Sequence, residues 1–224
     1  MFSSRITYGR AGARNAGKRV VIIDVLRAVP TAIEIIKQKP SRYLMTSEEK
    51  KVCALNPDYF RVGKPYMGSK VRYDSPNSPT RITECDLTGR SVIHRTAGCG
   101  GCLDELKGQE HVLLCTFSNL DATKRTMQKI GGRWDIIAAG HQGNNPVNED
   151  NLCAIALNSE DFLFHQNNVN DKLQGSESLV RFSSNSLEYP LSDLDFCFSN
   201  AQNSIVISAN RQENMWLIES MNQT

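Results

Sequence analysis

The chain has 224 residues, of which 26 are lysine or arginine and 24 are aspartate or glutamate. This length is enough for one large domain or two small ones, with a hydrophobic core that needs no disulfides. The near balance of charge argues against a dedicated nucleic-acid surface, and the lack of an apolar run of about 18 residues argues against a membrane span.

The cysteines and the first residues indicate the cellular compartment. Residues 1–5 lack the apolar centre of a signal peptide. The seven cysteines are spread from Cys53 to Cys197, unlike the dense disulfide framework of a small secreted protein. We therefore expect a cytoplasmic protein with buried free thiols, such as Cys115 in its apolar run.

Apolar runs of strand length alternate with segments of helical period over the first two thirds of the chain. Strands are predicted at 20–25, 43–45, 91–94, 111–116 and 134–139. Helices are predicted to begin near Pro30, Ser47 and Asn119, the last one ending at Gly131-Gly132. This alternation predicts an α/β fold with a mostly parallel sheet and helices on both faces.

The pattern weakens after residue 157. The polar segment 158–185 is interpreted as loops and short helices, with a lid as one reading. A helix at 192–198 and a β-hairpin formed by 204–208 and 215–218 are predicted beyond it. We thus expect an α/β core with the active site over 1–157, and a smaller C-terminal α+β portion over 158–224 that packs on or covers the core.

Three acidic residues follow the ends of apolar strands. Asp24 ends the first run, and Glu149-Asp150 lies a short loop beyond the strand at 134–139. Loops at the carboxyl ends of parallel strands meet at one edge of a sheet, where ligands bind. Acids gathered there need a cation or a proton, and Mg²⁺ is the natural cation. The alternative is that Glu149 and Asp150 merely favour the start of a helix.

Arg27 lies three residues after Asp24. A metal or phosphate site uses both groups, the carboxylate for the metal and the planar guanidinium for phosphate oxygens. A structural ion pair at the start of the next helix is the alternative, and the sequence leaves both open.

The loop around Asn77 and Ser78 is held by Pro76 and Pro79. Because each proline fixes its own backbone and lacks an N–H, the loop is rigid and presents an amide and a hydroxyl suited to oxyanions. An ordinary surface turn has the same composition and remains the alternative.

The strand at 91–94 runs into a glycine-rich turn. Such a turn lets backbone N–H groups approach an anion, with Arg95 or Thr96 contacting phosphate. His94 is expected to face a neighbouring helix. Cys99 and Cys102 in this turn allow a redox pair as another reading. Half a zinc site is a weaker one, because no second pair has suitable spacing.

The strand at 111–116 ends in Ser118 and Asn119, either of which is a natural N-cap for the next helix. A contact with an anion at the same place is compatible with that role. His141, after the next strand, could be a general acid or a loop residue, and the loop reading is favoured.

Taken together and in order, these segments resemble the 2-phosphosulfolactate phosphatase family, the ComB-like proteins. The matching stretches are 20–28 (VVIIDVLRA), 77–79 (NSP), 89–96 (GRSVIHRT), 117–119 (FSN), 139–140 (AG) and 149–154 (EDNLCA), with further similarity at 8–14 (YGRAGAR) and 195–197 (DFC). The resemblance covers about residues 5–220.

The resemblance implies a Mg²⁺-dependent phosphatase with an α/β fold of its own, acting on the phosphate ester of a small acidic 2-hydroxy acid. In the name-giving branch the product is sulfolactate, on the route to coenzyme M. The partner expected is a small phosphorylated acid rather than nucleic acid or a membrane, and a homodimer stays open.

The residue roles expected on this basis fall into three groups. The catalytic residues are Asp24, Arg27 and Asn119; the metal ligands are Asp24, Glu149 and Asp150; and the substrate-binding residues are Asn77, Ser78, Arg95, Thr96, Ser118 and Gly140.

Two stretches depart from the family pattern. The turn at 97–102 (AGCGGC) lacks the hydroxyl and amide residues usual there, and 29–31 (VPT) replaces a threonine-rich stretch. These departures motivate two alternatives: a catalytically weak or inactive anion-binding homologue, and a thiol redox protein that uses Cys99 and Cys102.

Overall fold

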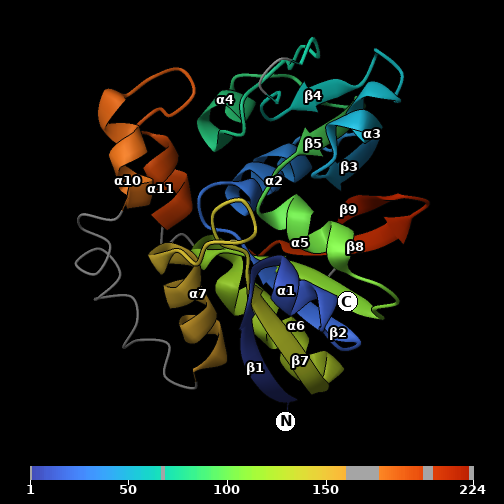
Figure 1. Cartoon of the computed structure of the whole chain (residues 1–224), viewed down its shortest axis with the longest axis vertical. Coiled ribbons are helices and arrows are strands. Elements are labelled where there is room, and N and C mark those ends of the chain that lie inside the picture. Colours follow the sequence, from blue (N-terminus) through green and yellow to red (C-terminus); the bar gives the residue numbers. More distant parts are fainter. Residues whose placement is uncertain (1, 67–68, 160–176, 199–203, 222–224) are drawn as a thin grey trace.

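The computed structural model describes residues 2–66, 69–159, 177–198 and 204–221 (Figure 1). Within them the strands form one nine-stranded sheet of order β1-β7-β2-β6-β8-β9-β3-β5-β4. The strands are β1 (Phe2–Tyr8), β2 (Arg19–Ile23), β3 (Arg42–Thr46), β4 (Phe60–Val62), β5 (Ser91–Arg95), β6 (His111–Cys115), β7 (Gly132–Ala138), β8 (Val206–Gln212) and β9 (Met215–Met221). The predicted strands and the predicted hairpin are thus present, and β1 and β4 are additional.

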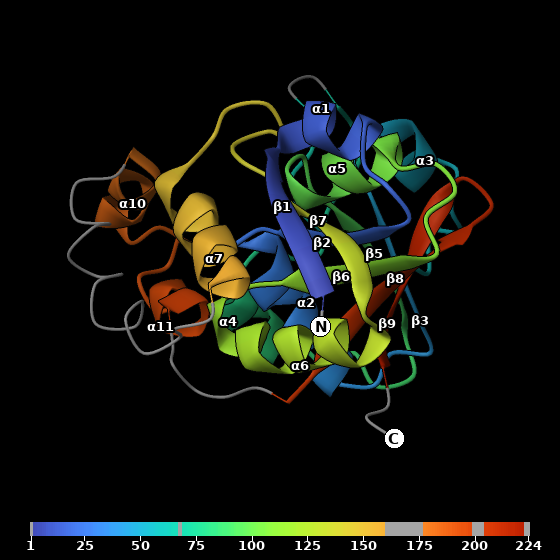
Figure 2. The same ribbon diagram turned by 90° about the horizontal axis from the view of Figure 1, so that it is seen from below.

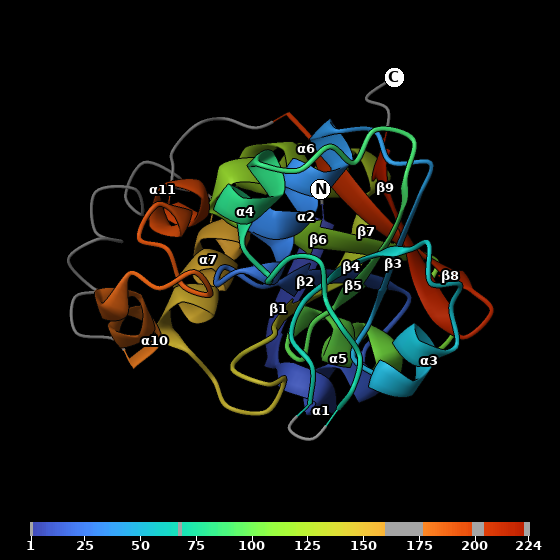
Figure 3. The same cartoon turned by 90° about the horizontal axis from the view of Figure 1, so that it is seen from above.

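Helices cover both faces of this sheet, as predicted (Figures 2 and 3). They are α1 (Gly9–Arg14), α2 (Ala28–Lys37), α3 (Glu49–Cys53), α4 (Pro79–Thr83), α5 (Cys99–Glu105), α6 (Leu120–Ile130), α7 (Asn148–Asn158), α10 (Glu177–Val180) and α11 (Asp193–Phe198), with the short 3₁₀ turns η1 (Phe117–Asn119) and η2 (Arg181–Ser184). No helix in the described ranges is long and apolar enough to cross a bilayer.

The helix signals in the sequence work locally. Pro30 lies in the first turn of α2, and α6 ends at Gly131, whose positive φ of 71° suits glycine. The predicted helix at 192–198 is α11. Most of the predicted polar segment 158–185 lies outside the described residues.

The sheet is mixed and mostly parallel. One parallel block contains β1, β7, β2 and β6, and the other contains β3, β5 and β4. The hairpin β8–β9 lies between the blocks and pairs antiparallel with β6 and with β3. The sequence placed this hairpin in a portion that packs on the core, whereas the structure builds it into the middle of the sheet.

The hairpin also reverses the sense of the second block. Going from β6 through β8 and β9 to β3, each pairing is antiparallel, so β3 runs opposite to β6. The rule that carboxyl ends share one edge therefore applies only within each block. The strand ends of the two blocks nevertheless meet. This is shown by the N–H of Cys99, which follows β5 and donates to the carboxylate of Asp24, which follows β2, over 3.0 Å.

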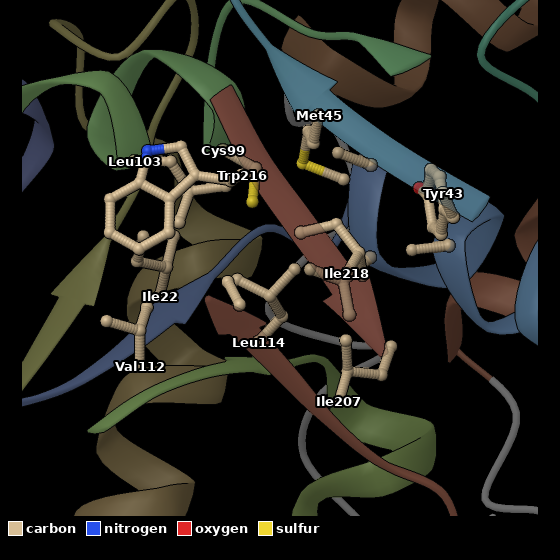
Figure 4. Close-up of a cluster of buried hydrophobic side chains, with 14 of the residues drawn as sticks. Ile22, Tyr43, Met45, Cys99, Leu103, Val112, Leu114, Ile207, Trp216 and Ile218 are labelled. Atoms are coloured by element: carbon tan, nitrogen blue, oxygen red, sulfur yellow. The ribbon is translucent and has the colours of Figure 1, made fainter. Parts of the chain in front are cut away.

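A shared hydrophobic core joins the two blocks. Ile22 and Leu114 of the first block, Met45 of the second, and Ile207 and Ile218 of the hairpin all belong to one buried cluster (Figure 4). A second cluster lies beneath α6 and α7 on the opposite face and includes Val21, Ile23, Met127, Trp134 and Cys153. The strand β2 feeds both clusters because successive side chains point to opposite faces.

Asn119 fastens the hairpin to the first block. Its Oδ1 accepts the N–H of Thr116 at 2.8 Å, and its Nδ2 donates to the carbonyls of Leu114 at 3.1 Å and Ile205 at 3.3 Å. The side chain is fully buried. These contacts explain its position by structure alone. Asn119 occupies the N-cap position of α6, as expected, but its side chain makes no capping hydrogen bond to that helix and is used for these contacts instead.

We therefore expect the substitution Asn119→Ala to lower the free energy of unfolding by about 2–4 kcal/mol, because it leaves buried backbone groups without partners. Urea denaturation measures this change. The matched control is Ser118→Ala at its part-exposed neighbour, which we expect to change stability by less than about 0.5 kcal/mol. Unchanged stability together with lost catalysis in Asn119→Ala would restore the catalytic role.

Candidate active site

A cleft of about 1300 Å³ lies where the loops after β2, β5 and β7 meet. Asp24, Thr96 and Gly140 come from these three loops. The remaining wall is formed by the loop that follows β4, by residues 73–77, and by the segment from Ser178 to Tyr189. Asp24, Glu149 and Asp150, which were expected to meet because they follow strand ends, all line this cleft.

Asp24 is held by the starts of two helices. Its Oδ1 accepts the N–H of Ala28 in α2, and its Oδ2 accepts the N–H of Cys99 in α5, both at 3.0 Å. The residue is only 6% exposed. Burial raises the pKa of Asp24, the two N–H groups oppose this rise, and the negative charge of Glu149 adds to it.

Asp150 joins the ends of two strands. Its Oδ1 accepts the N–H of Val25, and its Oδ2 accepts the N–H of Gly140, both at 2.8 Å. Burial and then the charge of Asp24 raise the pKa of Asp150 well above its usual value. The two aspartates therefore disfavour each other's charge while the backbone holds both in place.

Glu149 completes the acidic group. It is 2% exposed, and its Oε2 has no hydrogen-bond partner within the described part of the chain. A buried carboxylate oxygen without a partner is costly, and a cation or a proton relieves the cost. No three side chains of His, Cys, Asp or Glu in the described residues are grouped as an all-protein metal cage.

Arg27 lines the same cleft and forms an ion pair with an acidic residue that is distant in the sequence. Its Nη1 forms an ion pair with Asp193 in α11 and donates to the carbonyl of Glu188 at 2.7 Å. The guanidinium carbon lies 4.5 Å from the ring centre of Tyr189. The structural ion pair, one of the two alternatives for Arg27, is present. Its partner is Asp193 in the C-terminal segment rather than Asp24.

Ser78 does not reach the cleft. It is fully buried, its hydroxyl donates to Asp193 at 2.7 Å, and its oxygen accepts the N–H of Arg81 at the start of α4. Ser118 and Asn119 are likewise absent from the cleft wall. The direct substrate contacts predicted for Ser78 and Ser118, and the catalytic contact predicted for Asn119, therefore do not fit these positions.

The other substrate-binding candidates do line the cleft: Asn77, Arg95, Thr96 and Gly140. The guanidinium of Arg95 stacks over Tyr66 at 3.8 Å, and its buried Nε has no hydrogen-bond partner. Gly140 has a φ of +73°, and a Cβ there would lie 2.3 Å from the carbonyl oxygen of Asn145. Only glycine fits this turn without rearrangement.

Three further cationic side chains line the cleft, and none of them was predicted as a site residue from the sequence: Arg10, Lys64 and Arg181. Arg10 is closely enclosed, because a Cβ at Gly101 would lie 2.8 Å from its guanidinium and one at Gly143 would lie 3.1 Å from its Cγ. The signal for Arg10 was its place in the matching stretch 8–14. Arg181 approaches His141 to 3.3 Å, and His141 itself lies in a loop on the wall, as predicted.

The thiols are unsuited to redox chemistry in this fold. Cys99 and Cys102 are free and fully buried. Burial, and then the charge of Asp24, raise the pKa of the Cys99 thiol well above its usual value, and the pKa of Cys102 is raised for the same reasons. A raised pKa removes the reactive thiolate, contrary to the effect expected from the helix start.

The chain is an α/β protein in which buried carboxylates and several arginines line one cleft. Residues 7–194 match the model of the family described as 2-phosphosulpholactate phosphatase. The chain belongs to this family.

Three curated relatives, each named "Probable 2-phosphosulfolactate phosphatase", are similar to the chain at low identity. The protein of Thermoplasma volcanium is 27% identical over 145 residues, which cover 61% of this chain and 65% of the relative. That of Symbiobacterium thermophilum is 26% identical over 147 residues, covering 63% of each. That of Deinococcus radiodurans is 26% identical over 145 residues, covering 62% and 60%. The matched stretch therefore spans less than two thirds of each relative.

Thiol labelling tests the exclusion of a redox role. In the native protein at pH 8 we expect iodoacetamide to modify the exposed Cys53 and to leave Cys99 and Cys102 unmodified, because both are buried as neutral thiols. Peptide mass spectrometry locates the label, and the protein unfolded in urea is the control in which all seven cysteines react. Rapid native labelling of Cys99 would support the redox reading instead.

The acidic group also predicts a pH dependence of stability. Because the folded-state pKa values of Asp24 and Asp150 are raised, their contribution is present at low pH and is lost as pH rises through those values. Glu149→Gln removes a charge that raises both pKa values. In EDTA, we therefore expect the Tm of the variant relative to wild type to increase between pH 5 and pH 8.

The Tm difference between Glu149→Gln and wild type should increase by several degrees, since each kcal/mol of unfolding free energy corresponds to about 2–4 °C in a chain of this size. Differential scanning calorimetry measures it, with Glu213→Gln at the exposed hairpin turn as the matched control. An equal Tm difference at both pH values would show that the three acids do not repel one another.

Proposed function

We propose that the protein is a Mg²⁺-dependent phosphatase that hydrolyses the phosphate ester of a small acidic 2-hydroxy acid resembling 2-phosphosulfolactate. The observation that carries this proposal is the meeting of Asp24, Glu149 and Asp150 with arginines in one cleft. Membership of the family named for this activity, and the printed names of the relatives, support it.

The acidic group is compatible with Mg²⁺. This ion prefers oxygen ligands, keeps several waters, and usually binds through one or two carboxylates together with substrate phosphate. The unpartnered Oε2 of Glu149 is the natural direct ligand, and Asp24 and Asp150 would hold the ion directly or through water. When bound, the ion would polarise a phosphoryl oxygen and offset its charge.

The remaining chemistry belongs to the side chains of the cleft. Arg27 and Arg95 would orient the phosphate and the second acid group, since a planar guanidinium suits both. Asp193 fixes the direction of Arg27, and Tyr66 fixes that of Arg95. Both oxygens of Asp24 already accept backbone N–H groups, which weakens it as a nucleophile and favours a holding role.

The unusual turn at 97–102 is compatible with activity. Its backbone contributes the N–H of Cys99 to Asp24, and no hydroxyl is needed for that contact. A Cβ at Gly98 would lie 2.8 Å from Oδ2 of Asp24, and one at Gly100 would lie 2.8 Å from Thr46. Close backbone approach thus accounts for the glycines, and the loss of hydroxyls bears on which substrate is bound rather than on whether the acids are held.

The test is phosphate release from a panel of small phosphate esters, with Mg²⁺ and with EDTA. We expect turnover only with the metal, and faster turnover of esters that carry a carboxylate or sulfonate than of esters of uncharged alcohols. Glu149→Gln should lower kcat/KM at least about 100-fold, roughly 2.7 kcal/mol of transition-state stabilisation.

Glu213→Gln, outside the cleft, is the matched control and should retain wild-type kinetics. Turnover that persists in EDTA and in Glu149→Gln would remove the metal from the proposal. Binding of the phosphorylated acids with no turnover under any divalent metal would favour the inactive homologue.

A further inference from the structure

His94 connects the buried core to the cleft. It lies in β5 and is fully buried, with its Nδ1 2.8 Å from the hydroxyl of Tyr43 and its Nε2 3.0 Å from Oδ1 of Asn77. The rings of His94 and Tyr43 are nearly parallel, at 14°, with centres 6.2 Å apart. Asn77 lines the cleft, so the chain Tyr43–His94–Asn77 runs from the core to the cleft wall. From the sequence we expected His94 to face a neighbouring helix, whereas its ring nitrogens face Tyr43 in β3 and Asn77 in a loop.

With the Asn77 amide oxygen facing Nε2 of His94, the three groups fit one arrangement of protons. Oδ1 of Asn77 can only accept, so Nε2 of His94 must carry hydrogen. Burial lowers the pKa of His94 to about 3, so the imidazole is neutral and Nδ1 has a free lone pair. The Tyr43 hydroxyl, whose pKa burial raises well above its usual value, stays protonated and donates to that lone pair.

This arrangement determines which end of the Asn77 amide reaches the ligand. The oxygen is held by His94, and the NH₂ group, with two donors, has no hydrogen-bond partner in the described residues. Pro76 and Pro79 on either side restrict the loop backbone. If His94 took its other tautomer, the amide would turn and present an acceptor, which repels anions.

We propose that Tyr43 and His94 are positioning residues that fix the Asn77 amide as a donor to an anionic oxygen group bound in the cleft. The inference rests on the proposed function only for the identity of that group, which is the phosphate or the second acid of the substrate. His94 does not exchange protons with the substrate; it acts through Asn77.

The first test reads the tautomer directly and needs no activity. In protein labelled with ¹⁵N at histidine, long-range ¹H–¹⁵N spectra should show His94 as the Nε2–H form, without titration from pH 5 to pH 8. A dominant Nδ1–H form, or titration near the ordinary histidine pKa of about 6.5, overturns the inference. In Tyr43→Phe the lock on Nδ1 is absent, so both tautomers should appear.

The second test measures binding by calorimetry in Mg²⁺, with inorganic phosphate as one probe and sulfoacetate, which has two acid groups but no phosphate, as the other. We expect Asn77→Ala to weaken one of the two about 10–100-fold, because a donor to a charged group is lost without a charge being added. The probe that is weakened identifies the group that Asn77 binds. Equal affinity for both probes in Asn77→Ala and in wild type overturns the inference.

Matched variants separate positioning from folding. His94→Gln keeps a donor where Nε2 lies and should bind within about threefold of wild type, whereas His94→Leu should match Asn77→Ala, since both lose an interaction of similar strength. If His94→Leu does not fold, Tyr43→Phe replaces it, with several-fold weaker binding expected. Unchanged affinity in Tyr43→Phe together with a single Nε2–H tautomer overturns the role of Tyr43.

Kinetics distinguish this inference from the proposed function. In the phosphatase assay Tyr43→Phe should raise KM, keep kcat, and leave the shape of the pH profile unchanged, because His94 is not a proton donor. Turnover with unaltered KM in Tyr43→Phe and Asn77→Ala refutes the positioning chain and leaves the phosphatase intact. The expected tautomer and anion affinities without any turnover refute the phosphatase and leave the chain intact.

Discussion

The structure depends on holding three negative side chains together away from water. Asp24 and Asp150 each accept two backbone N–H groups, which come from the starts of α2 and α5 and from the ends of β2 and β7. Repulsion among Asp24, Asp150 and Glu149 opposes this arrangement, and the raised pKa values of the two aspartates reflect it. The fold therefore keeps a group of buried acidic side chains in place at a cost in stability, as functional sites commonly do.

The need for backbone donors explains the local sequence better than side-chain chemistry does. Each aspartate oxygen is reached by a main-chain group, so the chain must approach closely, and a glycine lies at or next to two of the four contacts: Gly140 is itself a donor, and Gly98 precedes the donor Cys99. A Cβ at Gly98 would press on Asp24, and one at Gly140 would meet the loop at Asn145. A turn composed of small residues is thus the requirement for building the acidic group, whatever hydroxyls other members of the family carry there.

Local patterns in the sequence predicted what is decided locally. The apolar runs predicted β2, β3, β5, β6 and β7 because these strands are largely buried. The strands β1 and β4 were not predicted, because β1 contains polar residues and is partly exposed along its whole length, and β4 has only three residues. The place of the hairpin in the middle of the sheet depends on pairing with strands far away in the chain, which no local pattern records. The partners of Asn119 and Ser78, Ile205 and Asp193, are distant for the same reason. The convergence of the acids was predicted correctly from strand ends, because Asp24 follows β2 and Glu149 and Asp150 follow β7, and these two strands are parallel neighbours in one block.

Asp193 shows why the site cannot be assigned to the first 157 residues alone. It accepts from Arg27, from the hydroxyl of Ser78 and from the N–H of Thr80, and so connects α11 to the loop after β2 and to the start of α4. The same segment supplies Phe182 and Tyr189 beside the guanidinium of Arg27. A buried arginine requires its counter-charge, since a single buried charge is far more costly than a pair. The C-terminal segment is therefore part of the cleft wall, and the direction of Arg27 is set by a residue that lies 166 positions further along the chain.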